Sequence, residues 1–180
     1  MESRAGAPMN NVSLKSTSIM VACAENRAIG LAGRHPWHPL RIEEDLRVFH
    51  GQTAGRTVLL GRICFETWPR VTLDGRRPVV VTSNAGIERP GVRVAPSFPA
   101  ALAIADSMPG EICILGGQRI YEEALELPNP LTLHLTLVHA TMPADRFFPE
   151  WRHLPWRETF RRESADANFR YTFLTLELER

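Results

Sequence analysis

Residues 35–49 read HPWHPLRIEEDLRVF, and this stretch decides the fold of the chain. A proline-rich turn leads into a helix, which we predict over residues 41–52 and which carries three consecutive acids near its start. At about 100° per residue, Asp45 falls on one stripe with the apolar side chains Ile42, Leu46 and Phe49. The sequence therefore predicts one carboxylate aimed at the interior of the protein.

An ionised carboxylate among apolar side chains is costly unless it has a partner, so Asp45 needs a distant side chain or a ligand. Glu43 lies to one side of the stripe and Glu44 lies opposite it, and we expect both to be solvated. On the alternative interpretation all three acids are solvated, because acids in a first helical turn oppose the positive end of the helix dipole. The helix alone leaves both interpretations open.

The chain has 180 residues, enough for one domain with a sizeable core. Its 21 basic and 20 acidic residues form no basic run, which argues against nucleic acid or a membrane surface as a partner. No apolar run approaches the roughly 20 residues of a membrane span. Three scattered cysteines predict neither a disulfide framework nor a zinc site, and the histidines are not spaced as metal ligands. We expect a cytoplasmic protein with a disordered extension at residues 1–16 and one domain at 17–180.

Apolar runs of strand length alternate with helical segments along the domain. This alternation predicts an α/β fold with a mostly parallel central sheet, flanking helices and an antiparallel C-terminal edge strand. The expected strands are 18–24, 57–60, 78–82, 92–95, 111–115, 131–138, 156–162 and 169–179. The expected helices besides 41–52 are 64–68, 97–107 and 118–127.

Polar and small residues follow three of these strands, where ligands of such sheets bind. They are Gly61-Arg62, Thr82-Ser83 and Gly116-Gly117. Two glycines at a helix start let backbone N–H groups approach an anion, and arginine and hydroxyl groups hold phosphate. Together these predict a phosphorylated dinucleotide across the strand tips, although a Gly-Gly pair is by itself more often a tight turn. The sequence contains no G-x-G-x-x-G, so an ordinary Rossmann site is not supported.

Two further features have alternative interpretations. Arg76 and Arg77 are either a solvated surface pair or a clamp for a carboxylate. Thr136 lies in an otherwise apolar strand, where its hydroxyl bonds either a neighbouring backbone group or Asp45 and its ligand.

In order and spacing these pieces resemble dihydrofolate reductase, from about Ser18 to the C-terminus. The resemblance is carried by Ala28-Ile29-Gly30, Pro36-Trp37, Asp45 with Leu46 and Phe49, Leu60-Gly61-Arg62, Gly75-Arg76, Leu115-Gly116-Gly117 with Tyr121, Thr136, and Asp145 with Phe148-Pro149. It implies reduction of 7,8-dihydrofolate to tetrahydrofolate by hydride transfer from NADPH in a monomer, a target of antifolate inhibitors.

The resemblance also implies roles for individual residues. Asp45 would be the acid of the pterin pocket, Thr136 would support it, Trp37 would order a nearby water, and Arg76 would grip the glutamate α-carboxylate. The other residues implied to bind substrate are Met20, Val21, Ala22, Leu46, Phe49, Trp68, Arg70, Leu73 and Leu115.

The residues implied to bind the cofactor include a mobile loop around 30–35 and a cis peptide between Gly116 and Gly117. They are Ala22, Ile29, Gly30, Arg34, His35, Gly61, Arg62, Ile63, Cys64, Thr82, Ser83, Asn84, Leu115, Gly116, Gly117, Gln118, Arg119, Ile120 and Tyr121.

Departures from the family pattern weaken parts of this site. Ile63 and Cys64 replace a basic residue and a hydroxyl found in many relatives, and Gln118 replaces a frequent glycine. A longer segment after Trp37 makes Glu44 the second candidate for the pterin acid. The rival functions are a reductase of the same fold that acts on another pterin or a pyrimidine intermediate of riboflavin biosynthesis, and a ligand-binding relative without catalysis.

Overall fold

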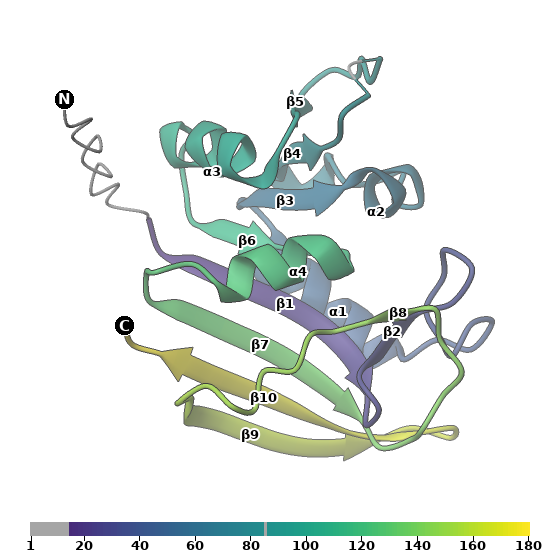
Figure 1. Cartoon of the computed structure of the whole chain (residues 1–180). Coiled ribbons are helices and arrows are strands. Elements are labelled where there is room, and N and C mark those ends of the chain that lie inside the picture. The colour runs from purple at the N-terminus through teal and green to yellow at the C-terminus, as the bar shows by residue number, and fades with distance from the viewer. Residues whose placement is uncertain (1–14, 85) are drawn as a thin grey trace, which may run out of the picture.

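The protein is built on an eight-stranded sheet with helices on both faces, seen in a computed structural model that describes residues 15–84 and 86–180 (Figure 1). The strand order is β5-β4-β3-β6-β1-β7-β10-β9. The strands of this sheet are β1 (Thr17–Ala24), β3 (Thr57–Gly61), β4 (Arg77–Val81), β5 (Arg93–Ala95), β6 (Ile112–Ile114), β7 (Leu131–Val138), β9 (Arg157–Ala165) and β10 (Arg170–Leu178). The helices are α1 (Glu43–Thr53), α2 (Arg62–Glu66), α3 (Phe98–Ser107) and α4 (Gln118–Leu125), and Leu73–Gly75 form a 3-10 turn.

The direction of the strands follows the hydrophobic pattern. The six strands from β5 to β7 run parallel to one another, and those at the centre are apolar runs buried on both faces. β10 runs antiparallel to β7, and β9 runs antiparallel to β10 at the edge of the sheet. The predicted α/β class with an antiparallel C-terminal edge is therefore confirmed.

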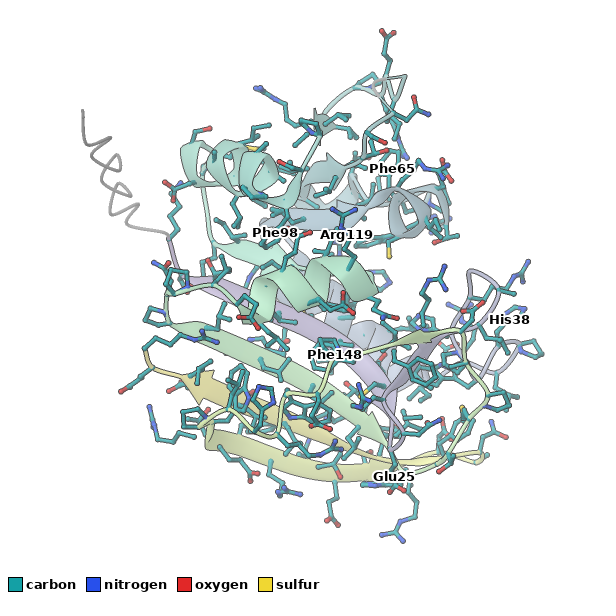
Figure 2. The ribbon with its side chains drawn as sticks, in the orientation of Figure 1. Glu25, His38, Phe65, Phe98, Arg119 and Phe148 are labelled. Carbon is teal, nitrogen blue, oxygen red and sulfur yellow. The ribbon has the colours of Figure 1, made fainter. Side chains whose placement is uncertain are left out.

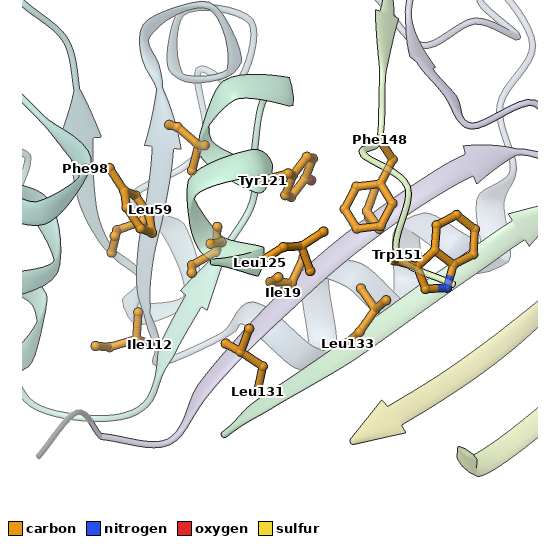
Figure 3. Close-up of a cluster of buried hydrophobic side chains, with 14 of the residues drawn as sticks. Ile19, Leu59, Phe98, Ile112, Tyr121, Leu125, Leu131, Leu133, Phe148 and Trp151 are labelled. Carbon is orange, nitrogen blue, oxygen red and sulfur yellow. The ribbon is translucent and has the colours of Figure 1, made fainter. Parts of the chain in front are cut away.

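Alternating side chains of the central strands divide the core into two layers. Ile19 and Val21 of β1 pack with α3 and α4, while Met20 between them packs on the opposite face with Phe65 of α2. Figure 3 shows part of the first layer, where the ring of Tyr121 on α4 lies edge-on to Phe148, 5.1 Å away between centroids. In Figure 1 α3 and α4 lie in front of the sheet and α1 lies behind it. The sheet therefore separates a tightly packed front layer from the back, where the predicted Asp45 helix lies.

Several predicted boundaries are corrected. The segment after Ala28 is not only a loop, since β2 (Ala28–Gly30) pairs with β8 (Arg146–Phe147) in a second sheet. α1 begins two residues later than predicted, at Glu43, and α2 begins at Arg62 rather than Cys64.

The predicted N-terminal extension falls largely outside the described residues. Of residues 1–16, the structure describes Lys15 and Ser16, and the backbone N–H of Ile112 donates to the Ser16 carbonyl at 3.0 Å. Within the described residues, no helix is long and apolar enough to span a bilayer.

Candidate active site

Asp45 projects from the first turn of α1 towards β7. Its Oδ1 accepts a hydrogen bond of 2.6 Å from Thr136 Oγ1, whose residue is buried. Burial raises the pKa of the Asp45 carboxyl, and the hydrogen bond from Thr136 opposes this shift. The inward orientation predicted from the helix pattern is therefore present, and so is the contact that the resemblance implied.

Apolar side chains surround this carboxylate on two sides. Trp37 is buried beside Ile42 in a cluster that Ala22 joins, and its ring stacks on His35 at 5.1 Å between centroids. Phe49, on the same helix as Asp45, packs with Met20 and against the Trp68 ring at 5.2 Å. The resulting surface suits a flat, apolar ring system with a few polar edges.

The other predicted substrate residues differ in where they lie. The Val21 side chain points to the opposite face of the sheet from Met20, because neighbours on a strand alternate. The predicted role of Val21 in enclosing the substrate therefore falls to its backbone. Leu115 joins the Met20 and Phe49 cluster, Leu46 is half-buried, and Leu73 and Arg70 are exposed.

Arg76 is buried, only 4% exposed, so the solvated-pair interpretation is wrong for this residue. Its Nε donates to Thr53 Oγ1 at 2.8 Å, and its Nη2 donates to the His50 carbonyl at 2.9 Å. Its Nη1 donates to the Leu73 carbonyl at 2.8 Å and to the carboxylate of Asp74 at 3.0 Å. The guanidinium is thus held rigidly between α1 and the 3-10 turn, 5.1 Å from the Trp68 ring centroid.

Two glycine-bearing strand ends meet on the other side of the Met20 cluster. The N–H of Gly61, at the end of β3, donates to the Gly116 carbonyl at 2.8 Å. The Gly116–Gly117 peptide bond is cis, as the resemblance implied, and Gly116 has φ +106°. A Cβ built on Gly117 would lie 3.9 Å from Cys64 Sγ. Because neither glycine has a side chain, a ligand can approach the backbone at the N-terminus of α4. This glycine edge of the sheet fits the phosphate-bearing cofactor predicted for it.

Comparison with known proteins agrees with this geometry. The sequence model described as dihydrofolate reductase matches residues 16–180. The chain belongs to the dihydrofolate reductase family. It is 40% identical over 166 residues to dihydrofolate reductase type 3 of Salmonella typhimurium, covering 91% of this chain and 98% of that one. It is 36% identical over 159 residues to dihydrofolate reductase of Neisseria gonorrhoeae, covering 87% and 94%.

A solved structure gives the same result. Dihydrofolate reductase from Enterococcus faecalis, complexed with NADP(H) and RAB-propyl, is similar with a TM-score of 0.76 and 29% sequence identity. The similarity covers 89% of this chain and 95% of that chain. The chain is accordingly an NADPH-dependent oxidoreductase of the dihydrofolate reductase family.

The charged residues expected to contact the cofactor of a dihydrofolate reductase point into solvent. Arg62 pairs with Glu66 one turn along α2, at 3.1 Å, and Arg119 is 89% exposed at its side chain and pairs with Glu123 on α4. Figure 2 shows Arg119 on the front helix layer, with the labelled Phe65 above it. Ile63 is exposed and Cys64 is half-buried.

Six further residues predicted to contact the cofactor lie just after β4 or on α4. Thr82 Oγ1 accepts from the N–H of Asn84 at 3.1 Å just after β4, and the adjacent Ser83 is exposed. Gln118 Oε1 accepts from the N–H of Phe147 at 2.9 Å, so it ties α4 to β8. The other two, Ile120 and Tyr121, are buried.

The loop expected to be mobile follows β2 and is pinned at its base. The N–H of Ala32 donates to Asp145 Oδ2 at 3.0 Å, and the N–H of Asp145 donates to the Gly30 carbonyl at 2.9 Å. Arg34 Nη1 lies 2.7 Å from His38 Nε2, and His35 stacks on Trp37. Ile29, in β2, is half-buried against the main core.

Sequence reasoning missed the contacts of three polar residues around the two ends of α1. Glu44, expected to be solvated, has a side chain only 25% exposed and bonds Ser164 and Tyr171, whereas Glu43 is 70% exposed as expected. The other two, His50 and Asp74, contact Arg76. The partners of Glu44 lie more than a hundred positions away, so no local pattern identified them.

Proposed function

We propose that this protein reduces 7,8-dihydrofolate to 5,6,7,8-tetrahydrofolate with NADPH, and that Asp45 assists protonation of the pterin. One observation carries the role of Asp45: its carboxylate is fixed by Thr136 between apolar side chains and has a raised pKa. A carboxyl group in such surroundings holds a proton more readily than one in water, which suits it to acid–base work.

NADPH supplies the hydride when bound, and the protein's own groups place the substrate. Thr136 occupies one lone pair of Oδ1, so Asp45 binds the pterin through Oδ2 and the free side of Oδ1 and favours a proton on the ring nitrogen beside the carbon that receives hydride. Trp37 orders the water that relays this proton, and Phe49 and Met20 keep bulk water away from the reacting atoms.

Arg76 binds the α-carboxylate of the substrate's glutamate tail. Thr53 and the carbonyl oxygens of His50 and Leu73 accept hydrogen bonds from three of the five guanidinium N–H groups. The second N–H group on each of Nη1 and Nη2 is therefore presented in a fixed direction. A clamp at this end of α1, with Asp45 at the other, matches an elongated substrate with a basic ring and an acidic tail.

We also propose a cytoplasmic monomer with diaminopyrimidine-type antifolates as inhibitors. The family resemblance implies the monomer. A protonated diaminopyrimidine offers two N–H donors to one carboxylate, the pairing that Asp45 is placed to make.

The test is the loss of NADPH absorbance in the presence of dihydrofolate. We expect turnover that depends on both compounds, and we expect Asp45→Asn to remove most of it. The absence of dihydrofolate-dependent oxidation in the folded protein would overturn the proposed function.

A further inference from the structure

The start of α1 is held to the sheet by the buried side chain of Ile42 and by polar contacts from its first turn. Ile42 precedes the helix without a side-chain cap, and within the helix only Thr53, at its far end, is fully buried. Leu46, Val48 and Phe49 are half-buried, and Val48 and Phe49 pack against two different core clusters. The rotation of the first turn therefore depends on Ile42 and on the polar side chains that tie this turn to the strands.

Glu44 makes three of these ties. Its Oε2 accepts from Ser164 Oγ at 2.6 Å and from the Tyr171 hydroxyl at 2.9 Å, and its Oε1 lies 2.7 Å from Arg162 Nη1. The Arg162 guanidinium is itself placed over the Phe173 ring, 4.6 Å from its centroid. The hydrogen bond from Ser164, followed by that from Arg162, lowers the pKa of Glu44 to about 2, so the carboxylate stays ionised.

Glu44 and Asp45 attach the helix to different strands. Asp45 bonds Thr136 on β7, and Glu44 bonds residues of β10 and β9, which follow β7 in the sheet. The two side chains leave the helix about 100° apart. The hydrogen bond to Asp45 alone would leave the first turn of α1 some freedom to rotate about the helix axis. Attachments in two directions allow only one rotation.

We propose that Glu44 is a positioning residue for dihydrofolate reduction, because its attachment to the β9–β10 hairpin sets the rotation of α1 and so the direction of the Asp45 carboxylate. This inference rests on the proposed function of Asp45. Glu44 acts through Asp45 and does not touch the substrate.

The test is Glu44→Gln, which keeps the size of the side chain and removes its charge. Because hydrogen bonds to a charged group are strong, we expect the KM for dihydrofolate to rise about tenfold. We also expect the apparent pKa in the pH profile of kcat to shift, because the surroundings of Asp45 change. The KM for NADPH should stay unchanged, since Glu44 is remote from the glycine edge. Glu43→Gln is the matched control and should leave all three values at wild type, because Glu43 is exposed and pairs with the exposed Arg41.

Two milder variants keep the test decisive if Glu44→Gln folds poorly. Ser164→Ala and Tyr171→Phe each remove one donor and leave the carboxylate in place, and each should shift the KM for dihydrofolate and the pH profile in the same direction by a smaller factor. If the Glu44→Gln protein folds and has the wild-type KM and pH profile, the inference is wrong. It is also wrong if the variant loses thermal stability while the KM and the pH profile stay at wild type. Such results in an active enzyme reject only the role of Glu44, whereas absent activity in the wild type rejects the proposed function.

Discussion

The ring of Tyr121 lies so close to Gly116 that a Cβ added to Gly116 would come within 2.8 Å of two ring carbons. The Tyr121 hydroxyl holds the ring in place, because it lies 2.7 Å from the Met20 carbonyl oxygen and 2.8 Å from that of Leu115 and shares its single hydrogen between them. The glycine edge of the cofactor site is therefore shaped by a buried tyrosine of α4 that bridges β1 and the end of β6.

Gly116→Ala should therefore lower the free energy of unfolding by about 2–4 kcal/mol, because the methyl group overlaps the Tyr121 ring and φ is +106°. Denaturant unfolding measures this, and the KM for NADPH should rise with it. Gly51→Ala is the control: nothing lies within 4 Å of its added Cβ, and an alanine inside α1 should raise stability by about 0.5–1 kcal/mol. Equal effects of the two variants would contradict this account.

Asp45→Asn should reduce kcat by about a hundredfold or more, because the proposed proton-handling group is lost. The rate that remains should fall less steeply at high pH, since Asp45 no longer ionises. Steady-state rates across a pH series measure both effects. If Glu44→Gln gives this profile instead, Glu44 and not Asp45 is the pterin acid.

The same Asp45→Asn substitution should raise stability at neutral pH. The folded-state pKa of Asp45 is raised above 3.8, so the ionised form is the one that burial disfavours. Below pH 3.8 the carboxyl is protonated in both folded and unfolded chains, and the variant should gain nothing there. The gain should grow as the pH rises through the folded pKa, which thermal unfolding at several pH values would show. A gain that does not change with pH would contradict the assignment.

Thr136→Val should raise the pKa of Asp45 further, because the opposing hydrogen bond is lost while the burial remains. We expect the pH profile of kcat/KM to move to higher pH and the KM for dihydrofolate to rise about tenfold. Thr136→Ser keeps the hydroxyl and should restore both towards wild type. Failure of serine to rescue would show that the methyl group, rather than the hydroxyl, matters.

Asp74→Asn should lower the KM for dihydrofolate. The Asp74 carboxylate is 61% exposed and pairs with Arg76 Nη1 at 3.0 Å, so it competes with the substrate's tail for that donor. Since exposed ion pairs contribute about 0–1 kcal/mol, the KM should fall by a factor of about two to five. A dihydropterin without the glutamate tail should show no change. Glu111→Gln, which breaks the Arg56–Glu111 pair of the same length, is the control and should leave both substrates unaffected.

Much of the sheet is predictable because each central parallel strand is a local property of the sequence. The runs that become β1 and β3 are mostly apolar over strand length, and their hydrophobicity predicts burial. The pairing of β2 with β8 was not predicted, because elements of three and two residues form only when the folded chain brings them together.

The candidate site also has one part that the local sequence predicts and one part that it does not. Helix periodicity predicts that Asp45 faces inward, because that depends on its neighbours in α1. The attachment of Glu44 to Tyr171 spans 127 positions and depends on where the C-terminal hairpin lies. On the outward side of a helix, an acid that is solvated and an acid that meets another element have the same local sequence.

β9 lies at the edge of the sheet, and eight of its nine residues are exposed. Five of them are charged: Arg157, Glu158, Arg161, Arg162 and Glu163. Another chain that added a strand there would have to strip water from both signs of charge, which guards an open edge against aggregation. Replacing these charges with β-branched residues would create a site for fibril-like stacking, so the strand that bonds Glu44 also opposes edge-to-edge pairing with another chain.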